Sequence, residues 1–448
     1  MKQNAKKAVL TEGPVGRTLI TLTVPMLFGI ISMVIFNLVD TFFVGRLGAV
    51  ELAALSFTFP VVLVIASIAM GLGIGTSAVI SVAIGEGNTH KVQRLTTDSL
   101  MLSLLIVAVF AVAGLLTIDR VFTALGASPD ILPLIRRYMK IWYIGVICVV
   151  VPMVGNNAIR ASGDTKTPAI IMATAAAVNT IFDPLLIFGI GPFPRMEIAG
   201  AAAATVFGRA TTLILALYVL YRRKHMLTFE VPHLREVLQS WKRILYVGIP
   251  AASTRIIIPL TAGVITRILS TYGHKSVAGY GVATRIEFFF MTFIMALAAV
   301  LAPFVGQNRG AGRHDRVRDA MQFSTRFSLL YGVALIGVLF VVARPLATLF
   351  NKDDTVVATI TTYLRIVPVG YCLQGVLILC ASAMNVLNRP LHAAALSIGE
   401  MFVVYVPLAL LGSALFGVRG VYGALAVAYI LAGIASLLVM KRILAHLE

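Results

Sequence analysis

Two aspartates lie inside long apolar stretches of the sequence, where ionised side chains are rare. Asp40 occurs in NLVDTFFVG and Asp183 in NTIFDPLLIFG. An aspartate at the centre of a membrane helix costs about 2.5–3.5 kcal/mol on insertion scales, so such a residue commonly binds an ion or a substrate. If both stretches are parallel helices, each carboxylate lies about 12–14 Å from the helix end, counted to Gly48 and Pro192. This equal depth predicts one shared polar cavity.

Each aspartate has an amide on its own helical face. Asn37 precedes Asp40 by three residues and Asn179 precedes Asp183 by four, and both spacings align side chains on a helix. Pro184 has no N–H and leaves a backbone carbonyl of the preceding turn without its helical partner. Such oxygen atoms suit a proton or a small hard cation such as Na⁺. We predict a site for H⁺, or alternatively Na⁺, at Asp40, Asn179 and Asp183, and no other metal and no cofactor. The alternative is that each aspartate only bonds a neighbouring helix.

An apolar lining is predicted beside the same carboxylate. Met33 and Phe36 lie seven and four residues before Asp40 and therefore face the same way. Methionine and aromatic side chains form an adaptable surface for flat organic cations. We therefore predict that Asp40, Asn37, Met33 and Phe36 bind the substrate, with ordinary helix packing as the alternative for the apolar pair.

The composition indicates a membrane protein. The chain has 448 residues, of which 59% are hydrophobic and 12% charged. Soluble proteins are nearer half apolar and a quarter charged. The net charge of +18 lies mainly in short segments between apolar runs, such as RRKH (222–225) and RGAGRHDRVR (309–318). This pattern favours lipid headgroups as partners and argues against nucleic-acid binding.

Apolar windows predict an all-α integral membrane protein with twelve transmembrane helices. They cover 17–44, 52–83, 97–118, 137–157, 167–190, 198–221, 244–271, 277–306, 321–343, 358–384, 392–414 and 420–441. About 21 lysines and arginines lie at one side of these spans and about nine at the other, which predicts that both termini are cytoplasmic.

The two halves of the chain repeat at an offset of 225 residues. The matched pairs include Pro25 and Pro250, Gly48 and Gly273, Gly85 and Gly310, and Tyr138 and Tyr363. Six spans per repeat predict two pseudo-symmetric six-helix lobes in the same orientation, a parallel repeat. The predicted parts are an N-terminal lobe that holds the site (1–221), a cytoplasmic linker (222–243) and a C-terminal lobe (244–448). The positions that match Asp40 and Asp183 are Ile265 and Val406, so the site is predicted in one lobe only.

One further acid, Glu287, lies about ten residues into the eighth predicted span. It belongs either to a second polar site in the C-terminal lobe or to an ion pair with Arg255 or Arg209. The sequence alone leaves both interpretations open.

Three segments resemble the multidrug and toxic compound extrusion (MATE) transporters. They are NLVDTFFVGRLGAVELAALS (37–56), RASGDTKTPAIIMATAAAVNTIFDPLLIFG (160–189) and AGAAAATVFGR (199–209). The chain looks most like the DinF-like branch, in which the positions of Asp40, Asp183 and Asn179 form a cation-responsive site. The stretch YLRIVPVGYCLQGVLILC (363–380) of the tenth span has no acid, unlike the NorM-like branch, whereas Glu287 matches a glutamate often seen in the eighth span.

The resemblance implies a plasma-membrane antiporter, not an enzyme, that exports mainly cationic, amphipathic drugs as H⁺ or Na⁺ enters. Deprotonated Asp40 and Asp183 would attract the drug, and protonation from outside would discharge it. The absence of a Walker loop, HExxH or GxSxG elbow agrees with ion-gradient energy. A flippase for lipid-linked sugars is the alternative, because Arg209, Arg255 and Arg285 leave a basic cavity open. Two lobes in one chain make a monomer sufficient.

Overall fold

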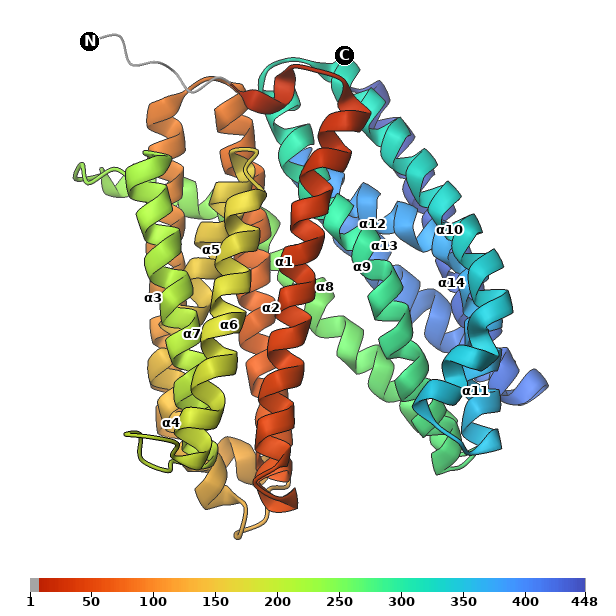
Figure 1. Ribbon diagram of the computed structural model, residues 1–448. Helices are drawn as coiled ribbons and strands as arrows, with labels where there is room; N and C mark the ends of the chain where they lie inside the picture. Colours follow the sequence, from red (N-terminus) through yellow and green to blue (C-terminus); the bar gives the residue numbers. More distant parts are fainter. Residues whose placement is uncertain (1–7, 448) are drawn as a thin grey trace. The chain divides into compact units, whose positions relative to one another are not determined.

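The computed structural model describes residues 8–447, which form helices and contain no strand (Figure 1). The earlier helices are η1 (Val9–Thr11), α1 (Val15–Gly45), α2 (Ala49–Gly85), α3 (Thr89–Ala124), α4 (Leu132–Gly145), α5 (Ile147–Ala161), α6 (Lys166–Phe188), α7 (Ile198–Tyr218), η2 (Val219–Arg223) and α8 (Leu234–Ser270). The later helices are α9 (His274–Gly310), α10 (His314–Phe350), α11 (Asp354–Ile366), η3 (Val367–Gly370), α12 (Tyr371–Val386), α13 (Pro390–Ile398), η4 (Gly399–Tyr405) and α14 (Val406–Ala445).

Each of the twelve predicted spans falls on helical segments of the chain. In the described residues, ten helical stretches are long and apolar enough to cross a membrane, and the pair α4 and α5, bent by 42°, makes an eleventh. The last stretch, Pro390–Ala445, contains Gly417 with a φ of 60°, a left-handed conformation that glycine adopts without strain. This kink separates the two final predicted spans.

The described chain divides into two compact units. One contains Thr21–Ala252, and the other contains Leu10–Ile20 with residues 253–447. These boundaries differ from the predicted parts at three places, one of which is that residues 244–252, predicted in the C-terminal lobe, belong to the first unit. The start of α1 belongs with the second unit, and the segment predicted as a linker (222–243) belongs with the first, where α8 already begins at Leu234.

The predicted linker is held to the first unit by hydrogen bonds rather than free in solution. The backbone N–H of Thr228 donates to the hydroxyl of Thr97 at 3.1 Å, and the indole of Trp241 donates to the carbonyl of Asp98 at 3.0 Å. Arg94 on α3 forms a buried ion pair with Asp98 one turn along. The linker therefore covers the end of α3.

Helices α6 and α7 lie side by side in the first unit (Figure 1). Their approach depends on the small residues of AGAAAATVFGR, because small side chains let helix backbones come close. A Cβ added at Gly208 would lie 3.0 Å from the carbonyl oxygen of Ala175 and 3.2 Å from the Cβ of Asn179. This contact places Arg209 of α7 next to the polar turn of α6.

The loop between α5 and α6, which contains SGDTKTP, has a structural role. Asp164 accepts hydrogen bonds from the backbone N–H of Thr167 at 3.0 Å and from its hydroxyl at 2.8 Å. Its carboxylate also pairs with Lys224 just after η2, at 2.7 Å. Asp164 thus caps the start of α6 and ties it to the chain after α7.

Candidate functional site

Asn179 and Asp183, the two predicted site residues on α6, contact each other, as their spacing of four residues indicates. Asp183 and Asn179 are both fully buried, and the amide of Asn179 donates to one carboxylate oxygen of Asp183 at 3.2 Å. The second carboxylate oxygen of Asp183 and the amide oxygen of Asn179 have no hydrogen-bond partner in the protein. Buried oxygens without partners are costly, so two acceptors remain here for a ligand.

Asp40 of α1 lies in the same lobe and faces an arginine. Arg209 of α7 is the opposite charge that acts on it, and Asp40 and Asp183 are close enough to interact electrostatically. One carboxylate oxygen of Asp40 is buried without a hydrogen-bond partner in the protein. The structure therefore brings together the two predicted acids and one cation.

Arg209 also contacts the predicted apolar lining of α1. Its guanidinium lies 4.6 Å from the centre of the Phe36 ring, and Nη1 lies 3.6 Å from the sulfur of Met33. Phe36 is buried and Met33 half-buried, whereas Asn37 is exposed on α1. Met33, Phe36 and Asp40 therefore gather around Arg209.

Arg209 was not predicted in this group, but only as a partner of Glu287 or as part of a basic cavity. The available signal was a single arginine inside an apolar span, directly after the glycine that α6 approaches. Its neighbours could not be inferred, because they come from a helix about 170 residues earlier in the chain.

Tyr138 of α4 is a second residue that sequence reasoning missed. It is buried and interacts electrostatically with both Asp40 and Asp183. Its repeat mate, Tyr363, donates a hydrogen bond to Glu287 in the other unit. The 225-residue offset had already paired these tyrosines, so the repeat contained a signal that each one accompanies a buried carboxylate.

A second arginine, Arg160, contacts α1 nearer its N-terminus than Arg209 does. Arg160 of α5 is half-buried, its Nη2 donates to the amide oxygen of Asn157 at 2.5 Å, and its Nη1 lies 3.8 Å from the sulfur of Met26. Met26 and Met33 are two helical turns apart on one face of α1. Two guanidinium groups therefore line this face of α1 at different depths.

Glu287 belongs to a polar cluster in the second unit, and among the residues that the structure describes it forms no ion pair with an arginine. The hydroxyl of Tyr429 donates to one of its oxygens at 2.7 Å, and the hydroxyl of Tyr363 donates to the other. Arg209, one of the two predicted partners, lies with Asp40 in the first unit. Of the two interpretations that the sequence left open, the structure supports the second polar site.

The cluster around Glu287 contains a second buried acid on an irregular helix. Glu400 lies in η4, a π-helical segment, and interacts with both Glu287 and Gln374. Such segments are frequent at functional sites, because their wider turn redirects side chains. Five buried polar atoms here have no partner in the protein; they belong to Glu400, Gln374, Tyr371, Tyr405 and Tyr422.

These two groups are suited to binding small cations and protons. In the part of the chain that the structure describes, no three His, Cys, Asp or Glu side chains are grouped to hold a metal ion. The first unit instead offers two carboxylates, an amide oxygen and one guanidinium, and the second offers two carboxylates among tyrosines. Both sets can exchange protons or bind a hard cation through oxygen atoms.

The sequence model of the MatE family matches the chain twice, over residues 25–185 and 250–411. The two matches begin 225 residues apart, at the offset of the internal repeat. Together they cover most of the chain.

Individual relatives are similar to this chain over almost its whole length. A protein of Shewanella oneidensis named FAD transporter is 40% identical over 97% of this chain and 96% of its own. The probable multidrug resistance protein YoeA of Bacillus subtilis is 26% identical over 88% of this chain and 86% of its own. The crystal structure of the Vibrio cholerae MATE transporter VcmN in the bent form has a TM-score of 0.92 and 29% identity, covering 97% of this chain and 98% of that one.

Proposed function

Because the chain belongs to the MATE family of multidrug and toxic compound extrusion transporters, we propose that it is a secondary antiporter of the DinF-like branch. It exports amphipathic organic compounds, mainly cations, in exchange for H⁺. The observation that carries the proposal is the group of Asp40, Asp183 and Arg209 in one lobe. The net charge of this group depends on how many protons it holds.

The net charge of this group explains how proton entry is coupled to cation export. With both carboxylates ionised, Asp40, Asp183 and Arg209 together carry one negative charge, which attracts an organic cation. Phe36 and Met33 contact its apolar rings. One proton makes the group neutral and a second makes it positive, so protons that arrive from the outer side expel the cation.

Na⁺ is the alternative coupling ion. The free carboxylate oxygens of Asp40 and Asp183 and the free amide oxygen of Asn179 are hard ligands of the kind that such a cation takes. The same three residues therefore serve either ion, and only a transport measurement distinguishes them.

The test is uptake of a fluorescent organic cation into inside-out proteoliposomes under an imposed pH or Na⁺ gradient. We expect the pH gradient alone to drive uptake, Asp40→Asn to abolish it, and Asp130→Asn to leave it unchanged. Asp130 is a matched control because it is an exposed acid in the loop between α3 and α4. Uptake by Asp40→Asn at the wild-type rate, or no uptake by the wild type under either gradient, contradicts the proposal.

FAD is a second candidate substrate. The relative that is 40% identical over almost its whole length is named FAD transporter. FAD combines a flat ring system with a negatively charged diphosphate, and Arg160 and Arg209 supply two cations along α1.

In the same proteoliposomes, Arg160→Gln should slow FAD uptake and leave organic-cation uptake unchanged. Equal effects on both substrates would remove the support that Arg160 lends to FAD. No contact of the described residues favours a lipid-linked sugar.

The Glu287 cluster is proposed as a second protonation site in the C-terminal lobe. Its support is the burial of Glu287 and Glu400 among hydroxyl groups without partners. The remaining proposals follow from the sequence: the protein lies in the plasma membrane, both termini are cytoplasmic, and a monomer suffices.

A further inference from the structure

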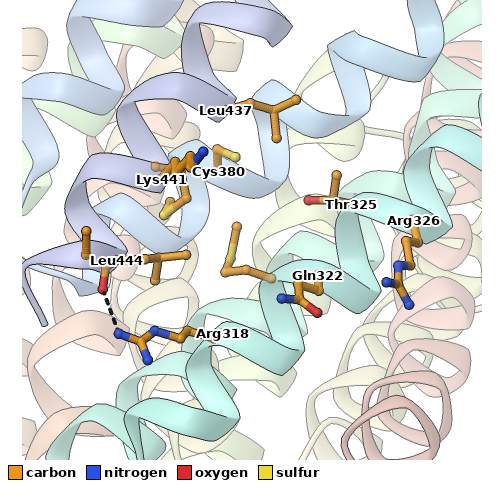
Figure 2. A pocket seen from close by; sticks show the side chains of 11 residues that line it. Arg318, Gln322, Thr325, Arg326, Cys380, Leu437, Lys441 and Leu444 are labelled. Carbon is orange, nitrogen blue, oxygen red and sulfur yellow. Dashed lines mark hydrogen bonds between the residues drawn. The ribbon is translucent and has the colours of Figure 1, made fainter. Parts of the chain in front are cut away.

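A cavity of about 520 Å³ lies between α10, α12 and α14 of the second unit (Figure 2). Its lining consists of Arg318, Met321, Gln322, Thr325, Arg326, Cys380, Leu437, Met440, Lys441, Leu444 and Ala445. The α10 residues and the α14 residues each recur at intervals of three and four, so each helix contributes one continuous face. Cys380 of α12 is fully buried and closes the cavity between them.

The polar part of the lining is basic. Arg318, Arg326 and Lys441 contribute three positive charges, and none of the lining residues, all of which are described, is an aspartate or glutamate. Gln322 and Thr325 add hydrogen-bond donors on α10. Arg318 donates to the carbonyl of Leu444 at 3.4 Å, a bond that joins the two helix faces (Figure 2). This set of donors suits an anionic oxygen-rich group such as a phosphate.

The other part of the lining is apolar. Met321, Met440 and Cys380 are buried, and Leu437 and Leu444 are half-buried at the same cavity. A free phosphate ion would leave these side chains without a partner. A ligand with both a charged head and a hydrocarbon chain matches both parts of the wall.

The charged residues also stand at the expected border of the hydrocarbon layer. On α10 the uncharged run 327–343 begins directly after Arg326 and ends at Arg344, so the two arginines are 18 residues, or about 27 Å, apart. This length matches the ~30 Å hydrocarbon core of a bilayer. On α14 the uncharged run 420–440 ends at Lys441. Arg326 and Lys441 therefore reach headgroup depth on the side of the membrane where α14 ends.

We propose that this cavity binds an anionic phospholipid, with the phosphate at Arg318, Arg326 and Lys441 and part of an acyl chain against Met321, Met440 and Leu437. Basic pockets between helices on the cytoplasmic side commonly bind such headgroups, and anionic lipids concentrate in that leaflet. The volume of the cavity lies in the ordinary range for small-molecule sites. None of its lining residues belongs to the Asp40 group.

The test is lipid binding to the purified full-length protein in detergent, measured by native mass spectrometry with phosphatidylglycerol and phosphatidylcholine of identical chains. We expect phosphatidylglycerol to bind at least tenfold more tightly, and Arg326→Gln with Lys441→Gln to weaken it about 30-fold. The matched control is Arg235→Gln with Lys242→Gln, which removes two exposed charges from α8, also on the predicted cytoplasmic side.

A second variant, Gln322→Glu, adds a negative charge to the cavity at an exposed position and should abolish phosphatidylglycerol binding without affecting folding. Equal affinity for the two lipids, or equal loss in the α8 control, would show that the cavity is not a specific site. Complete displacement of the lipid by millimolar inorganic phosphate would also overturn the proposal, because the hydrocarbon chain would then contribute nothing.

Discussion

Replacing single tyrosine hydroxyls around Glu287 tests the C-terminal polar cluster. Tyr429→Phe and Tyr363→Phe each remove one hydrogen bond to a different oxygen of this buried carboxyl group. Tyr422→Phe removes a buried hydroxyl that has no partner in the protein, while its ring keeps its contact with Tyr363 at 5.0 Å. All three variants thus remove one hydroxyl group from the cluster, but only Tyr429→Phe and Tyr363→Phe also remove a hydrogen bond.

The expected loss of stability depends on whether the hydrogen-bond acceptor is neutral or charged. Neutral hydrogen bonds between membrane helices average about 0.6 kcal/mol, whereas bonds to charged groups contribute about 1.5–3 kcal/mol. The charge-assisted value applies to the state in which Glu287 has released its proton and both of its oxygens accept a hydroxyl hydrogen. We expect Tyr429→Phe and Tyr363→Phe each to lower the free energy of unfolding by about 1.5–3 kcal/mol. Tyr422→Phe should change it by less than about 0.5 kcal/mol, since no bond to the protein is lost.

The assay is unfolding in mixed micelles with increasing sodium dodecyl sulfate, followed by reaction of a thiol dye with Cys380. In a Cys148→Ser, Cys372→Ser background, Cys380 is the single thiol, and it is buried in the second unit. A loss in Tyr422→Phe as large as that in Tyr429→Phe would refute the reasoning, because the ring environment rather than the bond would then decide the outcome. A double-mutant cycle with Glu287→Gln should recover most of the Tyr429 effect as coupling energy.

The other predictions concern helix packing, the half-buried Asp164–Lys224 ion pair and topology. Gly208→Ala should lower the free energy of unfolding by about 1–3 kcal/mol, because its Cβ would press on α6. Gly263→Ala, with open space around the new Cβ, should raise it by up to about 1 kcal/mol. Equal unfolding free energies for the two variants would contradict the α6–α7 contact. Burial alone would raise the pKa of Asp164, but hydrogen bonds from Lys224 and Thr167 lower it below its usual value. This carboxylate therefore stabilises the fold above pH ~4 and loses that effect as pH falls further, so Asp164→Asn should be less stable than wild type at pH 7, and the difference should shrink as pH falls below ~4. In intact cells, a membrane-impermeant maleimide should label a cysteine at Asp130 but not one at Val231, whose side chain is 94% exposed; the reverse pattern would invert the proposed orientation.

Much of the architecture could be predicted from the sequence. Apolar windows located all the spans, because a bilayer requires about 20 apolar residues for each helix whatever its neighbours are. The 225-residue offset indicated two equivalent halves, and the family matches begin at the same offset. Spacing within one helix also predicted a local contact correctly, since Asn179 and Asp183 are four residues apart on α6 and share a hydrogen bond.

Contacts between helices required the tertiary structure. The sequence analysis offered Arg209 or Arg255 as partners of Glu287, yet Glu287 accepts from two tyrosines, and Arg209 lies with Asp40, Phe36 and Met33. Periodicity reports which way a side chain points from its own helix, but it does not say which helix lies opposite. That choice is made by packing, here by the close approach of α6 and α7 at Gly208. The spans, the repeat and the presence of buried charges follow from the order of the residues. Which charge neutralises which follows from the fold, because in a low-dielectric interior it depends on distances of a few ångströms between residues far apart in the chain.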